Sequence, residues 1–248
     1  MHSWRAGYLN ELYLMFYRKK IVMFVVLSAL LPILLVLSLH ALQPILGLIA
    51  VSQSFPIQML TIYTGLWIPL FIFTMTGDLF PNEIAAKTLK LALLRPNSRY
   101  QVYGTKVAAL GTGIAGILLI LGLVTFICNL FTGTAANVSD TFHMILAYIA
   151  AFVSMFALSA VFIFVAQFFK SASSFMVFSI VLYVAAKIAP FLLRSISAFS
   201  PFTYTDWHML WLSQTVPTSR LVTSSMFLIS SWLLFLAIGY YKFDKKEV

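Results

Sequence analysis

The chain has 248 residues, of which 61% are hydrophobic and only 9% are charged, and its formal net charge is +9. A soluble domain carries about 25% charged residues, so this composition is typical of a membrane protein. The positive charge does not indicate a nucleic-acid partner, because the basic residues gather beside the ends of apolar runs. The single cysteine, Cys128, excludes a disulfide or a cysteine metal site within one chain.

Residues 1–20 predict a helix that lies flat at the membrane surface before the first apolar run. Leu9, Leu12, Tyr13 and Phe16 recur at helical spacing. Aromatic side chains suit the headgroup zone of a bilayer, and the basic residues at 18–20 suit anionic lipid. The alternative is a ragged, positively charged start of the first span.

Six apolar runs are long enough to cross a bilayer, whose hydrocarbon core needs about 20 helical residues. They are residues 21–39, 57–75, 107–131, 142–169, 175–193 and 222–241. We therefore expect an all-α polytopic membrane protein, in which residues 1–248 form a single transmembrane domain. Six spans place both termini on the same side of the membrane.

The distribution of lysine and arginine predicts which side this is. Almost all of the 16 basic residues flank the apolar runs on the side of the termini. Only Arg194 and Arg220 lie in the opposite loops, and Lys187 lies within a predicted span. By the positive-inside rule, both termini are cytoplasmic.

Between the second and third apolar runs the chain becomes charged. Each of these charges would cost about 2.5–3.5 kcal/mol at the centre of a membrane helix, so the segment is expected in water on the cytoplasmic side. The charged residues are Asp78, Glu83, Lys87, Lys90, Arg95, Arg99 and Lys106. A charged helix in this position can be held by a soluble partner. The alternative is that its basic residues only fix the topology.

The outer loop at residues 194–221 is too aromatic for a water-exposed loop. We expect it to dip into the outer leaflet as short helices that are broken at Pro201 and Pro217. Just before it, Lys187 is the one basic residue deep in a predicted span. It can reach the outer interface with its long side chain, or it can line a polar cavity of the bundle.

Motifs for catalysis are missing from the sequence. There is no G-x-x-x-x-G-K-[ST] sequence, so the chain has no P-loop and we do not expect it to hydrolyse ATP by itself. We expect no catalytic residues, no metal site and no cofactor in the chain. Gly111, Gly113 and Gly116 match a dinucleotide-binding pattern, but they lie inside an apolar run, where small residues indicate close helix packing.

The charged segment resembles the corresponding segment of ABC-2 type ABC transporter permeases. In that family an acid, a Glu, a Gly-Thr-Leu sequence, an apolar pair, a Pro, an Arg and a Gly-Lys pair precede the third span. The matching residues here are Asp78, Glu83, Thr88 and Leu89, Leu93 and Leu94, Pro96, Arg99, Gly104 and Lys106. Ser200, Pro201 and Phe202 are similar to the outer re-entrant region of the family. Lys87 departs from the pattern, because the family usually has Gly there.

The resemblance implies a connecting helix at the membrane surface, six spans, a coupling helix between spans two and three, and re-entrant outer helices between spans five and six. It implies a separate cytoplasmic ATPase subunit that binds ATP and Mg, and a second copy of the permease or a homologous permease. Membrane lipids are the remaining expected partner. The residues expected to contact the ATPase are Glu83, Lys87, Thr88, Leu89 and Lys90.

The sequence therefore favours a permease that moves a hydrophobic or amphipathic substrate out of a bacterial cell, across the plasma membrane. Within the resemblance, small exporters of this kind handle antimicrobial or toxin peptides or give immunity against them. Lys187 is the candidate for the substrate path. Two alternatives belong to other classes: a membrane scaffold that recruits a soluble partner without transport, and an intramembrane enzyme.

Overall fold

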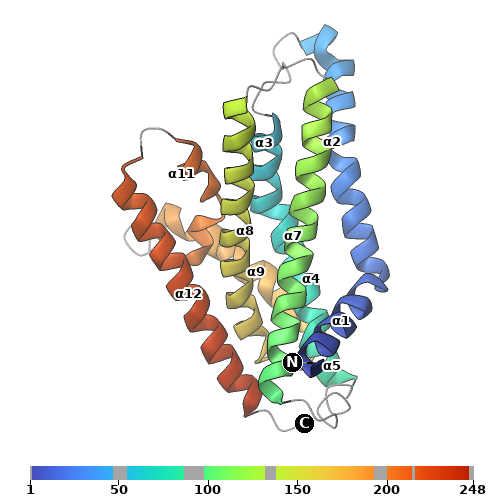
Figure 1. The fold of residues 1–248 in the computed structure, drawn as a ribbon, viewed down its shortest axis with the longest axis vertical. Coiled ribbons are helices and arrows are strands. Elements are labelled where there is room, and N and C mark those ends of the chain that lie inside the picture. Colours follow the sequence, from blue (N-terminus) through green and yellow to red (C-terminus); the bar gives the residue numbers. More distant parts are fainter. Residues whose placement is uncertain are drawn as a thin grey trace.

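The computed structural model describes residues 2–46, 55–86, 98–131, 138–192, 200–213 and 216–245. Every regular element in these ranges is a helix (Figure 1). Six of the helical stretches are long and apolar enough to cross a membrane. The predicted fold class, an all-α protein with six membrane-spanning helices, is confirmed.

The helices follow one another in the order that the apolar runs predict. The first part of the chain forms α1 (His2–Phe16), α2 (Lys19–Leu46), α3 (Phe55–Ile62), the π-helical turn η1 (Tyr63–Trp67), α4 (Ile68–Leu79) and α5 (Pro81–Ala85). The second part forms α7 (Arg99–Phe131), α8 (Val138–Ala166), α9 (Ala172–Leu192), the 3-10 turn η2 (Pro201–Tyr204), α11 (His208–Leu212) and α12 (Thr218–Asp244). The second span thus consists of α3, η1 and α4 in continuous succession.

The α1 helix exposes most of its large apolar side chains. Tyr13, Phe16 and Tyr17 are largely exposed, whereas Glu11 and Met15 face the other helices. Figure 1 shows α1 meeting α2 at a bend, so that α1 does not continue the first span. An aromatic outer face beside a span suits the headgroup zone of a bilayer, and the interfacial position of α1 stays a prediction.

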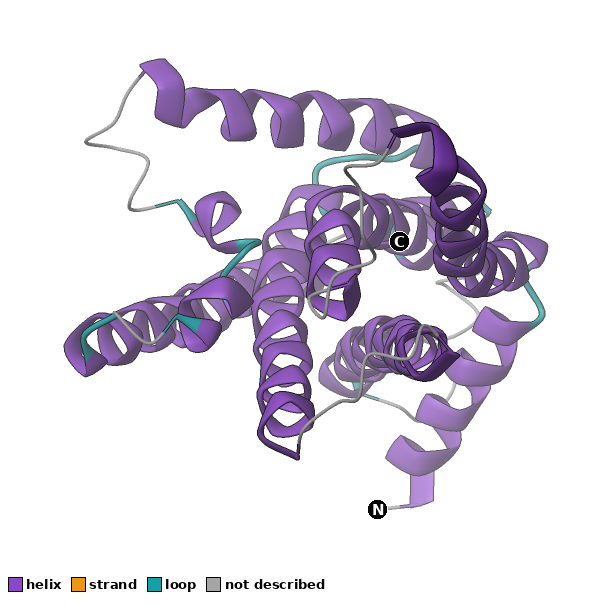
Figure 2. Cartoon of the chain, turned by 90° about the horizontal axis from the view of Figure 1, so that it is seen from above, coloured by secondary structure: helices purple, strands orange, loops and turns teal. Residues whose placement is uncertain are grey.

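The core forms around α4, which contacts α7, α8 and α9. Almost every residue of α4 is buried, and the ring centroids of Phe73 and Phe162 of α8 lie 4.5 Å apart. Seen from above, long helices lie along the edges of the bundle (Figure 2). Among the six spans, α9 and α12 bury the smallest share of their residues. Both helices expose long apolar faces, as expected of helices that border lipid.

Two glycines of α7 allow aromatic rings to approach its backbone. A Cβ atom on Gly111 would lie 2.8 Å from Phe156 Cε2, and a Cβ atom on Gly113 would lie 2.9 Å from Phe71 Cζ. The predicted close packing is therefore confirmed for these two glycines. It is wrong for Gly116, which faces open space.

The third span begins earlier than predicted. We expected residues 99–106 in a polar segment, but α7 begins at Arg99. Two features allow the helix to continue through these polar residues. The aromatic ring of Tyr103 is buried, and Lys106, which is also buried, has carboxylate partners.

We predict that Gly113→Ala lowers the stability of the protein, because the new methyl group overlaps the ring of Phe71. Overpacking of this kind costs about 1–3 kcal/mol. The matched control is Gly116→Ala on the same helix, where the methyl group meets open space. The thermal midpoints of the two variants, measured in detergent by loss of helical circular dichroism, should separate. Equal midpoints would show that Phe71 moves aside without cost.

Candidate functional site

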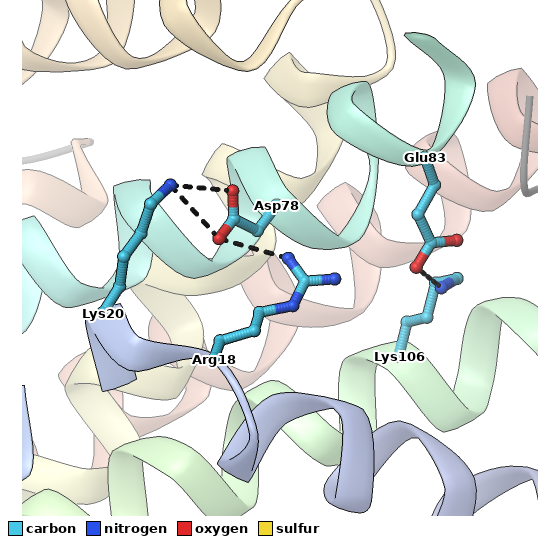
Figure 3. Close-up of polar contacts among 5 residues, drawn as sticks. All are labelled: Arg18, Lys20, Asp78, Glu83 and Lys106. Carbon is cyan, nitrogen blue, oxygen red and sulfur yellow. Dashed lines mark hydrogen bonds and ion pairs between the residues drawn. The ribbon is translucent and has the colours of Figure 1, made fainter. Parts of the chain in front are cut away.

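Charged side chains gather at one end of the bundle. This end, which we call the basal end, holds α1, α5, the start of α7 and the last turn of α12 (Figure 1). Asp78, in the last turn of α4, accepts two cations there. Its Oδ2 lies 3.1 Å from Arg18 Nη1, and its Oδ1 lies 3.3 Å from Lys20 Nζ. These contacts bind the turn between α1 and α2 to the end of α4 (Figure 3).

A second ionic contact is centred on Lys106 of α7. Its Nζ lies 3.0 Å from Glu11 Oε1 of α1 and 2.7 Å from Glu83 Oε1 of α5. The Lys106 side chain is only 1% exposed, and the two carboxylate side chains are 11% and 14% exposed. Figure 3 shows the contact between Glu83 and Lys106 beside that of Asp78. One ammonium group thus joins three helices. We call Glu11, Glu83 and Lys106 the basal triad.

The formal charges of the two ionic groups cancel when they are taken together. The cations are Arg18, Lys20 and Lys106, and the anions are Glu11, Asp78 and Glu83. A buried charge without a partner is costly, and the cost is reduced only when each charge is paired and hydrogen-bonded. Because the positive and negative side chains are equal in number and paired, these ionisable groups can be buried beside a membrane-spanning core.

Local sequence features place Glu83 opposite Lys106. Phe80 ends α4 with φ −115° and ψ −72°, and Pro81 then begins α5. A proline suits the first turn of a helix, because its fixed φ angle fits and its missing N–H is not needed there. The ring of Phe80 lies 5.8 Å from that of Tyr103 and 6.2 Å from that of Phe243. The buried Phe80 thereby fixes the point at which the chain turns into α5.

The other side of the connection between spans two and three is held by α12. Arg99 Nη1 donates a hydrogen bond to the carbonyl oxygen of Asp244. Nearby, the Tyr103 ring packs against Tyr240 and Phe243 at centroid distances of 5.7 and 5.5 Å. The connection therefore leaves from α5, which is fixed by Lys106, and returns at α7, which is fixed to α12.

Comparison with known proteins gives one family. Residues 39–248 match the ABC-2 family transporter proteins. The chain belongs to this family. No curated protein matches it. The permease is accordingly the membrane component of an ABC transporter, and its family carries no ATPase domain of its own.

The structure places one of the five predicted ATPase contacts. Glu83 lies on α5 and is bound to Lys106. Lys87, Thr88, Leu89 and Lys90 lie outside the described residues. Their role in partner binding stays a prediction. In the described parts of the chain no group of three His, Cys, Asp or Glu residues could hold a metal ion.

The basal triad was not predicted from the sequence. Lys106 was expected in the polar segment before span three, and no role was predicted for Glu11. Arg18 and Lys20 were expected to meet anionic lipid, but both contact Asp78. An acid within α1 and a lysine near the start of an apolar helix were the available clues, yet their pairing spans 95 positions of sequence.

Lys187 of the permease contacts the segment between spans five and six. Its Nζ donates a hydrogen bond to Thr205 Oγ1 and lies 3.7 Å from Asp206 Oδ2. The Lys187 side chain is 33% exposed and that of Asp206 is 46% exposed. The ammonium group also lies 5.9 Å from the centroid of the Tyr183 ring. Lys187 thus fastens the residues that follow η2 to α9.

The aromatic residues between spans five and six pack inside the protein. Phe202 and Trp207 are buried, and Trp207 Nε1 donates a hydrogen bond to Ser224 Oγ at 2.9 Å. Phe202 packs against Phe162 of α8 and Tyr183 of α9, and Trp207 packs between α8 and α12. The expected short helices form as η2 and α11, and their position in the outer leaflet stays a prediction. Pro201 begins η2 and Pro217 precedes α12, where the sequence predicted breaks.

We predict that Lys106→Met strongly destabilises the permease. The substitution leaves Glu11 and Glu83 facing one another with no cation between them, and breaking a buried ion pair typically costs about 3–5 kcal/mol. The matched control is Lys20→Met, because Lys20 is 60% exposed and Arg18 still neutralises Asp78. Thermal unfolding in detergent should show a large fall for Lys106→Met and little change for Lys20→Met. Similar midpoints would show that the basal triad contributes little to the stability of the protein.

Proposed function

We propose that the permease exports a hydrophobic or amphipathic substrate, driven by a separate cytoplasmic ATPase subunit that binds ATP and Mg. The observation that carries this proposal is the double anchoring of the connection between spans two and three. One side is held by Lys106 through Glu83, and the other side is held by α12 through Arg99. A segment anchored in this way can pass an external push to several membrane helices at once.

The basal end is cytoplasmic in this proposal. The excess of basic residues near both termini supports that orientation. A coupling segment then begins in the cytosol, beside the termini, with the residues Glu83, Lys87, Thr88, Leu89 and Lys90. In this arrangement Glu83 acts as the anchor of the segment, and the following residues meet the ATPase.

The permease works with a second copy of itself or with a homologous permease, in the plasma membrane of a bacterial cell. The exposed apolar faces of α9 and α12 offer surface for such a partner as well as for lipid. Antimicrobial or toxin peptides are the substrates that the family resemblance favours. A purely scaffolding role is the rival, and it predicts ATPase binding without any transport.

The first test concerns the ATPase. The permease should co-purify with an ATPase subunit, and Lys90→Glu should weaken that complex, because charge reversal at an interface replaces attraction by repulsion. The matched control is Lys245→Glu, which reverses an exposed charge near the chain terminus on the same side. We expect roughly a tenfold loss of affinity for Lys90→Glu, which corresponds to about 1.4 kcal/mol. Equal loss in both variants would indicate non-specific attraction, and no loss in either would remove Lys90 from the interface.

The second test concerns Lys187, which we propose lies on the substrate path. Lys187→Ala should alter the ATP-driven uptake of an amphipathic peptide into inverted vesicles that contain the permease and its ATPase, because uptake into such vesicles corresponds to export from the cell. Lys187→Glu should alter export more, because it also repels Asp206, while Lys187→Arg keeps the charge and should be mild. Unchanged export in the Ala and Glu variants, at matched expression, would restrict Lys187 to fastening η2 onto α9.

A further inference from the structure

We infer that Lys106 is a positioning residue that makes α1 and α5 move as one body. The inference rests on the proposed function, in which the ATPase pushes on the segment that follows α5. Within that function it assigns a specific consequence: α1 follows the motion of this segment. The ionic contacts of Lys106 with Glu11 and Glu83 are the physical link.

The carboxylates of Glu11 on α1 and Glu83 on α5 repel each other unless Lys106 lies between them. Glu11 of α1 and Glu83 of α5 are both acids, and like charges at close range oppose contact. A lysine ammonium group carries three N–H donors and can therefore bind two carboxylates at once. Lys106 does so at 3.0 and 2.7 Å, which converts a repulsive pair of helices into an attached pair.

Burial makes this attachment firm. The Lys106 side chain is 1% exposed, so water hardly screens its contacts. Electrostatic attraction strengthens as the effective dielectric constant falls. A buried ion pair seldom stabilises a fold better than apolar side chains of similar size would, but it does fix which groups lie opposite one another. Fixing the relative position of helices is therefore the role that this chemistry fits best.

The contacts of Asp78 give α1 a second point of attachment. Arg18 and Lys20 bind Asp78 at the turn between α1 and α2, whereas Glu11 lies about two helical turns earlier on α1. Besides its packing against α7, α1 is thus held by ionic contacts at two points along its length. Without the basal triad, α1 is expected to pivot about Arg18.

The first experiment uses the purified full-length permease and needs no ATPase. Nitroxide labels are attached to cysteines at Ala6 of α1 and Asn82 of α5, both exposed, in a chain whose native Cys128 is replaced by Ala. Pulsed electron spin resonance should give a narrow distribution of distances between them. Lys106→Met combined with Glu83→Met removes the link while leaving the net charge unchanged, and the distribution should broaden roughly twofold as α1 swings.

Three further variants make this result specific. Glu11→Leu removes only the contact of Lys106 with α1 and should also broaden the distribution of distances. Lys106→Arg keeps a cation with several hydrogen-bond donors and should leave the distribution of distances narrow. Lys20→Met removes a cation from the same end of the bundle and should leave it narrow as well. An unchanged width in both Glu11→Leu and the double variant would overturn the inference and assign the position of α1 to apolar packing.

The second experiment separates positioning from a merely structural role. In the complex with the ATPase that co-purifies with the permease, labels at Ala6 and at Met226 on α12 report the motion of α1 when ATP and Mg are added, with vanadate present. Labels at Asn82 and Met226 report the motion of α5. Both distances should shift in the native chain, and only the distance from Asn82 to Met226 should shift in Glu11→Leu. A shift of α1 in that variant equal to the native shift would refute the inference. If no ATPase co-purifies, the proposed function fails, while the width measured on the isolated chain still decides whether Lys106 joins the two helices.

Discussion

The balance of buried charge around Lys106 constrains how the helices of the basal end can be arranged. α1, α5 and α7 each bring one charged side chain to the basal triad, and withdrawal of Lys106 with α7 would leave the carboxylates of Glu11 and Glu83 without a cation between them. The same logic fixes the end of α4, where Asp78 is neutralised from the turn between α1 and α2. Apolar packing alone would permit these helices to slide, because dispersion contacts carry little directional preference.

The second span connects this basal network with the opposite part of the bundle. Thr61 Oγ1, in α3, lies 3.2 Å from His208 Nε2 of α11. One turn further on, the Tyr183 hydroxyl of α9 donates to the Gly65 carbonyl oxygen at 2.6 Å. Gly65 lies in η1, and π-helical turns inside α-helices are often found at functional sites. The span thus carries polar contacts from His208 to Asp78, with its π-helical turn between them.

The surroundings of η1 show how an irregular turn is accommodated in an apolar bundle. Tyr63 Oη donates to the carbonyl oxygen of Ser28, and Trp67 Nε1 donates to the Ser28 hydroxyl at 2.7 Å. Ser28 belongs to α2 and is fully buried. Because lipid supplies no hydrogen-bond partners, polar groups at this depth must be satisfied by neighbouring helices. The bonds to Ser28 meet this requirement for Tyr63 and Trp67, and that to Gly65 does so for Tyr183.

The sequence predicted those features that depend on a continuous stretch of chain. Apolar length gave the six spans, and Pro201 and Pro217 marked breaks between helices, because both signals are local. The basal triad could not be predicted in the same way. Lys106 is 95 positions from Glu11 and 23 from Glu83, and either acid could equally have faced solvent or a partner. The prediction of close packing at Gly116 was wrong for a related reason. A small residue permits close packing but does not determine whether another helix approaches it.

Lys106 and Lys187 illustrate how exposure decides the strength of an ionic contact. Lys106 is 1% exposed and lies 2.7 Å from its nearer carboxylate, whereas Lys187 is 33% exposed and lies 3.7 Å from Asp206. Water screens the second pair, and exposed pairs of this kind contribute about 0–1 kcal/mol. The contact between α9 and the residues after η2 can therefore be released at little cost, while the contact between α1 and α5 cannot. If the bundle changes shape during transport, these magnitudes place the yielding contact beside Lys187 and the rigid one beside Lys106.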